Sequence, residues 1–281
     1  MQNIDMTLVN FKNLENFVLS SFLAMGLRNE DAKIFTDALM FSELRFHSGQ
    51  GQGVQRITTY YKRIKNKEVN INIDLDIVKE SSSLALVDAK NGIGTVQASK
   101  CMDIAITKAK NEGIGQVIIK NSTHFGSSSV HAVRATKKNC IGIAYTNAGP
   151  EMAPWGSRSG GVGTNPWGIS CPTNRGYPLI LDIALTTAGK GMMRWHEREQ
   201  IPMPNDWALT KEGEETTNPS DAMDGFLLGI GKYKGYGLSF MTDILTGVIS
   251  GGGYGLIPYS DPKTVSYTHL RAHETGRNLV C

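Results

Sequence analysis

One histidine directly follows a predicted strand and is surrounded by small polar residues. Residues 121–126 read Asn-Ser-Thr-His-Phe-Gly and come after the apolar run 116–119. An imidazole at the end of a strand can enter a cleft, and because it titrates near neutral pH it can give or take the proton of an alcohol. His124 is therefore a candidate acid/base group. The alternative is a structural histidine with satisfied hydrogen bonds.

A second group of chemically capable residues surrounds the glycine-rich stretch 47–53. A guanidinium at Arg56, or less favourably at Arg45, can hold a carboxylate through two parallel hydrogen bonds. His47 is a candidate for a second acid/base group. The alternative is a flexible loop with surface arginines.

Two further glycine-rich segments could approach a ligand. Residues 231–237 read Gly-Lys-Tyr-Lys-Gly-Tyr-Gly and open a predicted amphipathic helix, where free N–H groups and two lysines suit an anion. The pattern matches neither a Walker A loop nor GxGxxG, and the alternative is a solvated lysine-bearing loop. Residues 163–168 read Gly-Thr-Asn-Pro-Trp-Gly, which by residue type alone favours a tight turn between strands.

One carboxylate lies within an apolar run. Asp182 belongs to the run 179–183 and needs a partner there, for which we considered a ribose hydroxyl and a structural arginine. His131 and His196 lack a metal-ligand spacing with other candidates, and the four cysteines form no CxxC pair. We therefore expect no metal site.

The elements that position these residues alternate between helical and extended patterns. Apolar residues at helical spacing predict helices over 14–24, 29–41, 54–64, 96–111, 128–138 and 236–249. Short apolar runs predict strands over 84–87, 116–119, 141–145 and 179–183. This alternation indicates the α/β class. No repeat or low-complexity linker marks a domain boundary.

The bulk composition excludes several classes of protein. The chain has 281 residues, a net charge of +3 and scattered lysines and arginines, so nothing favours a nucleic-acid partner. No signal peptide precedes the first predicted helix and no apolar run is long enough to span a membrane, so no membrane partner is expected. The scattered cysteines suit a reducing compartment. We expect a cytoplasmic enzyme.

Taken together, these segments resemble the malate/L-lactate dehydrogenase-like family, which includes ureidoglycolate dehydrogenase, diketogulonate reductase and cyclic ketimine reductases. The resemblance covers roughly residues 10 to 255, and no single motif is specific by itself. The matching segments, in family order, are residues 113–115, 121–126, 146–147, 163–166, 181–183, 201–202, 207–208, 234–238 and 243–248.

The resemblance implies a non-Rossmann α/β fold that binds NAD or NADP, and a homodimer. It implies hydride transfer between the nicotinamide and the carbon next to the carboxylate of a small 2-hydroxy or 2-oxo acid. His124 would exchange the proton, and Arg56 would anchor the carboxylate. The residues at family cofactor-contact positions are Ala148, Leu181, Asp182, Ile183, Tyr233 and Lys234. A cyclic ketimine reductase and a non-catalytic, truncated dinucleotide-binding fragment are the alternatives.

The sequence departs from the family pattern beside Arg56. The family commonly has Ser-His-Gly before Val-x-Arg, and that histidine is an acid/base group in some members. The corresponding residues 51–53 read Gly-Gln-Gly. Gln52 can form hydrogen bonds but cannot shuttle a proton. His47, five positions earlier, is a candidate substitute, and we expect His124 to carry the proton chemistry.

The C-terminal segment departs more strongly. Family sequence fades after about residues 254–258, whereas the family normally continues well beyond this point. Residues 265–281 resemble the translated read-through of a sequencing adapter, and we exclude His269, His273 and Cys281 from functional reasoning. The expectation is a family domain over residues 1–258, C-terminally truncated, followed by a non-native tail over 265–281.

Overall fold

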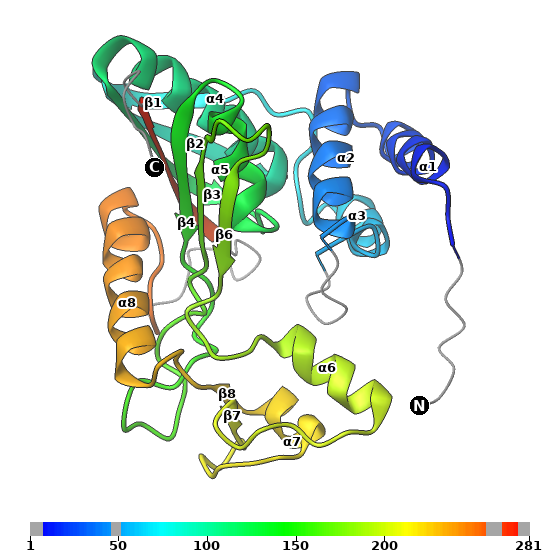
Figure 1. Cartoon of the computed structure of the whole chain (residues 1–281), viewed down its shortest axis with the longest axis vertical. Helices are drawn as coiled ribbons and strands as arrows, with labels where there is room; N and C mark the ends of the chain where they lie inside the picture. Colours follow the sequence, from blue (N-terminus) through cyan, green and yellow to red (C-terminus); the bar gives the residue numbers. More distant parts are fainter. Residues whose placement is uncertain (1–7, 46–51, 257–265, 275–281) are drawn as a thin grey trace.

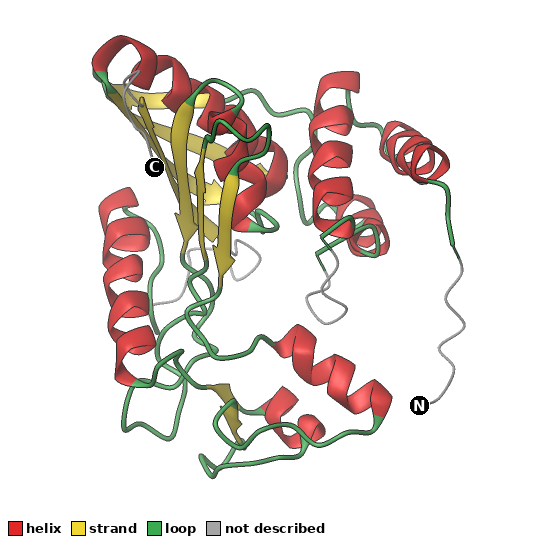
Figure 2. Cartoon of the chain, viewed as in Figure 1, coloured by secondary structure: helices red, strands yellow, loops and turns green. Residues whose placement is uncertain are grey.

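The computed structural model describes residues 8–45, 52–256 and 266–274, and it has a mixed seven-stranded sheet with helices packed around it (Figures 1 and 2). The strand order is β1-β2-β3-β9-β4-β5-β6. The strands of this sheet are β1 Asp76–Glu80, β2 Leu84–Gly92, β3 Ile114–Ser122, β4 Cys140–Thr146, β5 Trp167–Cys171, β6 Leu179–Ile183 and β9 Ser266–Glu274. The α/β class is confirmed.

The helices fall on both faces of the sheet and at one side of it (Figure 1). The helices are α1 Phe11–Ala24, α2 Asn29–Glu43, α3 Arg56–Lys65, α4 Gly94–Glu112, α5 Ser128–Thr136, α6 Lys190–Glu199, α7 Pro219–Asp224, α8 Tyr233–Asp243 and the π-helical turn η1 Ile244–Val248. A two-stranded ribbon of β7 (Ala208–Leu209) and β8 (Phe226–Leu227) lies near α6 and α7.

Four strands of the main sheet run in the same direction and end at the same edge. Strands β2 and β3 are parallel, β3 and β4 are both antiparallel to β9, and β5 is antiparallel to both β4 and β6. Strands β2, β3, β4 and β6 therefore end at one edge of the sheet, at Gly92, Ser122, Thr146 and Ile183. We call this the carboxyl edge of the sheet. Ligand sites in α/β proteins commonly lie at such an edge.

Two adjacent residues of β5 show that helices cover both faces of the sheet. A Cβ atom on Gly168 would lie 2.4 Å from the carbonyl carbon of Ser128, so this face packs closely on the start of α5. Successive side chains of a strand point to opposite faces. Trp167 accordingly points the other way, and its Nε1 donates to Oγ1 of Thr242 in α8 at 2.9 Å. The main apolar core lies between the sheet and helices α4 and α5.

Helices α1 to α3 form a helical unit beside the sheet with an apolar core of its own (Figure 1). Phe22 stacks on Phe35 with ring centroids 4.3 Å apart, and Phe35 meets the edge of Tyr60 at 4.6 Å. A buried carboxylate ties this unit to α4, because Asp31 pairs with Lys100 at 2.5 Å. Tyr60 is therefore packed in the apolar core of the helical unit, on the side that meets the sheet.

The predicted elements are largely present, and the differences lie in the segments between motifs. The predicted helix over 236–249 begins earlier, at Tyr233, and ends as the π-helical turn. The predicted turn 163–168 ends in strand β5 instead, because Trp167 and Gly168 pair with β4. Strand β1 and helices α6 and α7 were not predicted. Within the described residues, no helix combines the length and the apolar composition that a membrane crossing needs.

Candidate active site

The loop that carries His124 follows β3 at the carboxyl edge and is held from several sides. Tyr60 donates its phenolic hydrogen to the His124 carbonyl oxygen at 2.9 Å. Thr123 donates from Oγ1 to the Gly92 carbonyl at 2.9 Å and accepts from the Gly94 amide at 3.0 Å. The loop is thus fastened to α3 and to the start of α4. Such restraint is what a side chain with a catalytic position requires.

The hydrogen bonding of the His124 ring fixes where its proton lies. The backbone N–H of Gly126 donates to Nδ1 of His124 at 3.2 Å. An amide nitrogen cannot accept, so Nδ1 is the acceptor and the neutral ring carries its proton on Nε2. Gly126 has φ +82°, the left-handed region that glycine adopts readily. The hydrogen bond within the loop therefore uses Nδ1 and leaves the Nε2–H of the imidazole as the donor toward a ligand.

Two arginines of α3 act on this ring. His124 is partly buried, and burial together with the positive charges of Arg56 and Arg63 lowers its pKa to about 3. Burial also lowers the pKa of Arg56, and the charges of Arg63 and Arg194 act in the same direction. The structure thus brings His124 and Arg56 together from distant parts of the sequence. The ring is neutral across the physiological pH range, next to a guanidinium.

The other predicted residues beside Arg56 are placed differently. His47 lies outside the described residues. Arg45 turns away, with its guanidinium 3.6 Å from the centre of the Phe41 ring. Gln52, in the position of the family histidine, has a buried Oε1 without a hydrogen-bond partner among the described residues. Of the arginine candidates, only Arg56 acts on the His124 ring within the described chain.

Ala148 and the segment from Leu181 to Ile183 also lie at or near the carboxyl edge. The Ala148 amide, just beyond β4, donates to Oδ1 of Asn165 at 2.8 Å. Leu181 is 44% exposed, since β6 is the last strand of the sheet. Asp182 is also exposed rather than enclosed in an apolar run, and it accepts hydrogen bonds from the amide, at 3.0 Å, and the hydroxyl of Ser129.

Among the described residues, the first turn of α5 is therefore a protein partner of Asp182, and the contact anchors the helix that follows the His124 loop. A carboxylate at a helix N-terminus is a stabilising arrangement. A contact with a cofactor ribose stays a prediction.

Tyr233 and Lys234 occupy the first turn of α8, and both are exposed. This turn packs just past the end of β6, because a Cβ on Gly235 would lie only 2.5 Å from the Leu185 carbonyl oxygen. His124 follows β3, so four strand spacings separate the two places along the sheet order. At about 4.8 Å a spacing, strands β3 and β6 lie roughly 19 Å apart in the sheet. An extended ligand could reach from one place to the other.

Sequence reasoning missed a buried polar network that joins these segments. Asn165 has φ +37°, accepts from the Ala148 amide, and donates to the Ser239 carbonyl and to Oδ1 of Asp243, both at 2.9 Å. The other oxygen of Asp243 accepts from the Gly255 amide at 3.1 Å. The network ties the ends of β4 and β5 to α8. The signal in the sequence that could have indicated this network is the carboxylate of Asp243, which lies inside the apolar helical run 236–249.

This network predicts a pH-dependent stability. Burial raises the pKa of Asp243 to about 6, although its hydrogen bonds oppose the shift. A raised pKa in the folded state means that this carboxyl stabilises fully below about pH 4 and loses that contribution as pH rises through 6. Relative to Asp243→Asn, the free energy of unfolding should fall by up to about 3 kcal/mol between pH 4 and 7. Urea denaturation of both proteins at several pH values measures it, and a flat or rising difference would contradict the assignment.

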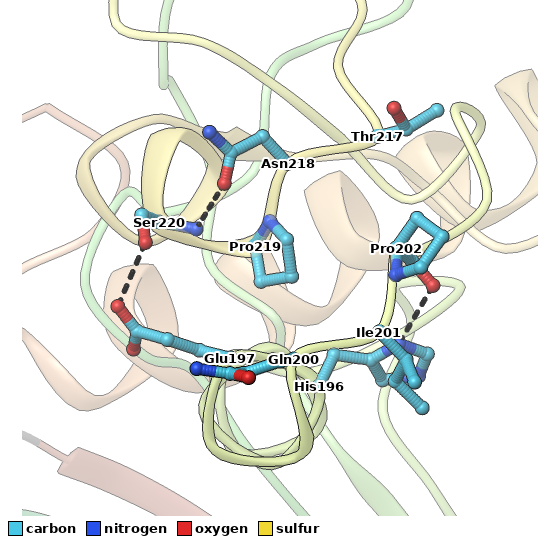
Figure 3. Close-up of a pocket in the computed structure, with 9 residues that line it drawn as sticks. All are labelled: His196, Glu197, Gln200, Ile201, Pro202, Thr217, Asn218, Pro219 and Ser220. Carbon is cyan, nitrogen blue, oxygen red and sulfur yellow. Dashed lines mark hydrogen bonds between the residues drawn. The ribbon is translucent and has the colours of Figure 1, made fainter.

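A separate pocket of about 360 Å³ lies between α6 and α7 (Figure 3). Its walls are held by hydrogen bonds from Ser220 to Glu197 at 2.8 Å and between the His196 ring and the Pro202 carbonyl at 3.0 Å. None of the predicted site residues lines it. In the described part of the chain, no three His, Cys, Asp or Glu side chains form a metal-binding group. The candidate site is therefore the carboxyl edge around His124.

Comparison with known proteins identifies the family. The model of the malate/L-lactate dehydrogenase family matches residues 9–275. The chain belongs to this family. Malate dehydrogenase from Pyrococcus horikoshii is 37% identical over 247 residues, which cover 85% of this chain and 68% of that protein. L-sulfolactate dehydrogenase from Methanocaldococcus jannaschii is 35% identical over 237 residues, covering 84% and 68% respectively.

Solved structures share the fold of this chain. Malate dehydrogenase from Entamoeba histolytica superposes with a TM-score of 0.90 at 27% identity, covering 96% of this chain and 79% of that one. The predicted family resemblance and fold class are thus confirmed. Strand β9 lies inside the matched range and within the sheet. The foreign origin of residues 265–281 stays a prediction.

Proposed function

We propose that this chain is a nicotinamide-dependent oxidoreductase that interconverts a small 2-hydroxy acid and the corresponding 2-oxo acid. The observation that carries the proposal is the neutral imidazole of His124, which lies within the electrostatic reach of Arg56 at the carboxyl edge. A guanidinium suits a carboxylate, and an imidazole suits the oxygen on the neighbouring carbon. The names of the relatives, malate and sulfolactate dehydrogenases, support this substrate class.

The residues at the far end of the carboxyl edge fit a dinucleotide. The first turn of α8 presents Lys232 and Lys234, both exposed, where a pyrophosphate would find cations near a helix N-terminus. Trp155 and Tyr233 stand 6.4 Å apart beside it, and their exposed rings suit a planar base. We propose that Tyr233 and Lys234 contact NAD or NADP, together with Ala148, Leu181, Asp182 and Ile183.

The protein side of the reaction follows from the geometry. A bound NADH or NADPH would supply the hydride that the substrate carbon gains. Arg56 holds the carboxylate and so aligns the neighbouring carbonyl with His124. Nε2–H of His124 donates to the carbonyl oxygen and stabilises the negative charge that develops there. The bound carboxylate also offsets the charge of Arg56 and so raises the pKa of His124 in the complex. The ring can then take up a proton from solvent, pass its Nε2 proton to that oxygen and return to its neutral form.

A turnover screen tests the proposed function. The purified chain is mixed with NADH or NADPH and with pyruvate, oxaloacetate, 2-oxoglutarate or cyclic imino acids, and the loss of reduced cofactor is followed. The proposal predicts oxidation with at least one 2-oxo acid. Oxidation with cyclic imino acids alone would assign a ketimine reductase instead. Calorimetric binding of a dinucleotide without any turnover would assign a non-catalytic binding protein.

Arg56 should contribute mainly to substrate affinity. We expect Arg56→Gln to lower kcat/KM for the 2-oxo acid by roughly 10- to 100-fold, chiefly through KM, because a charge-assisted bidentate contact is lost. Arg158→Gln is the matched control, since Arg158 is exposed and pairs with Glu214 on the surface. Steady-state kinetics of both variants make the comparison. Equal KM values for Arg56→Gln and the unchanged protein would contradict a role for Arg56 in substrate binding.

The proposal includes a homodimer in the cytoplasm. The family resemblance implies the dimer, and large apolar side chains exposed on α8 and the turn that follows support it. These side chains are Leu238, Phe240, Met241, Val248 and Ile249. The compartment rests on the sequence, whose scattered cysteines suit a reducing environment.

A further inference from the structure

A second histidine, unassigned by the sequence, lies behind the His124 loop. His131 is fully buried in α5, and its ring stacks against Phe125 with centroids 5.0 Å apart. Its Nε2 lies 2.8 Å from the Phe125 carbonyl oxygen, and its Nδ1 lies 3.2 Å from Oγ of Ser99 in α4. A carbonyl can only accept, so Nε2 carries the proton and Nδ1 accepts from the Ser99 hydroxyl.

The bond to Phe125 meets the same peptide unit that binds the His124 ring. The carbonyl of Phe125 and the N–H of Gly126 belong to one planar peptide and point in opposite directions. His131 holds the carbonyl end, and the N–H end donates to Nδ1 of His124 at 3.2 Å. A continuous chain of hydrogen bonds therefore runs from Ser99 through His131 and this peptide to His124. Bonds in such a chain polarise one another.

We propose that His131 is a positioning residue, which fixes the orientation and the Nε2–H tautomer of His124 through the Phe125–Gly126 peptide. This proposal rests on the proposed function for its kinetic consequences, whereas the tautomer is a property of the protein alone. By turning the peptide so that its N–H faces Nδ1, His131 leaves Nε2–H as the group that meets the substrate oxygen. The ring needs no rearrangement when the substrate arrives.

The surroundings of His131 keep its ring neutral, as the positioning role requires. Burial lowers its pKa to about 4, while the bond to the Phe125 carbonyl opposes that shift and Arg134 favours it. The ring therefore stays neutral at physiological pH, with one nitrogen donating and the other accepting. The charged group that faces it from α5 is Arg134, whose guanidinium is paired with Asp103 of α4. A neutral ring is what the donor–acceptor chain requires.

Three variants test the positioning role of His131. His131→Phe keeps the ring stack on Phe125 but removes both hydrogen bonds, His131→Gln restores a side-chain N–H donor, and Ser99→Ala removes only the remote end. For His131→Phe we expect kcat to fall roughly 10- to 100-fold, with KM for the 2-oxo acid changed less than about threefold. His131→Gln should recover most of kcat. Ile119→Val is the matched core control, and it should keep kcat.

Nitrogen-15 NMR of the histidine rings gives the readout that a merely structural role would not move. In the cofactor-free protein, the resonances absent from His124→Gln identify the His124 ring. We expect Nδ1 unprotonated in the unchanged protein, and a mixture of tautomers with a higher His124 pKa in His131→Phe. The same tautomer and the same kcat in His131→Phe would overturn the proposal. Absence of turnover in the unchanged protein would instead contradict the proposed function. The NMR comparison would still show whether His131 fixes the tautomer of His124.

Discussion

Replacing His124 with glutamine should lower kcat for 2-oxo acid reduction by roughly 10²- to 10⁴-fold, the contribution expected of a positioned acid/base group. Glutamine keeps an N–H donor but cannot carry the proton. The dissociation constants of NADH and NADPH should stay within about twofold, because the cofactor contacts proposed for Tyr233 and Lys234 lie on α8, whereas His124 follows β3. Rapid-mixing kinetics and calorimetry measure the two quantities on the same preparation.

A control histidine separates this effect from a general loss of structure. His196 is buried between Trp195 and Trp207, and its Nδ1 lies 3.0 Å from the Pro202 carbonyl. His196→Asn can keep a donor near that position, and we expect kcat within a few-fold of the unchanged protein. A His124→Gln protein that turns over as fast as His196→Asn would rule out the assigned role of His124.

The second large effect concerns stability. Asn165→Ala should lower the free energy of unfolding by about 3 to 5 kcal/mol, because each buried polar group that loses its hydrogen bond costs about 1 to 3 kcal/mol. The substitution removes the acceptor of the Ala148 amide contact, the donor to the Ser239 carbonyl and the donor to Asp243. It also places alanine at φ +37°, a backbone region that asparagine tolerates better.

Chemical denaturation measures this loss, with a surface asparagine as the control. Asn205 is exposed, and its amide donates to Glu215 at 3.1 Å. Asn205→Ala should change the free energy of unfolding by less than about 1 kcal/mol. If Asn165→Ala costs no more than Asn205→Ala, the network does not hold the ends of β4 and β5 to α8 in the way described.

The sequence predicted elements whose signals are local. Apolar spacing placed α1, α4 and α5, and small polar residues after an apolar run singled out His124. In these cases neighbours in the sequence supply the physical cause of the structure. Gly113, for example, ends α4 with φ +80°, as a glycine after a helical run leads one to expect.

The sequence could not predict the contacts that depend on strand order. Ser129 and Asp182 lie 53 residues apart, and they meet only because β5 brings α5 next to β6. The acid/base role proposed for His124 depends likewise on Arg56, which belongs to a different structural unit. His131 was judged only for metal-ligand spacing, because its partners at Ser99 and Phe125 become neighbours after folding.

Deuterium transfer tests the central claim most directly. The purified chain is given a 2-oxo acid accepted in the screen and NADH or NADPH carrying deuterium on both C4 positions, and the product is analysed by mass spectrometry. The account predicts a 2-hydroxy acid with one deuterium on the carbon next to the carboxylate, formed by the unchanged protein and at least about 100-fold more slowly by His124→Gln. Product without deuterium on that carbon, or equal rates for the two proteins, would contradict it.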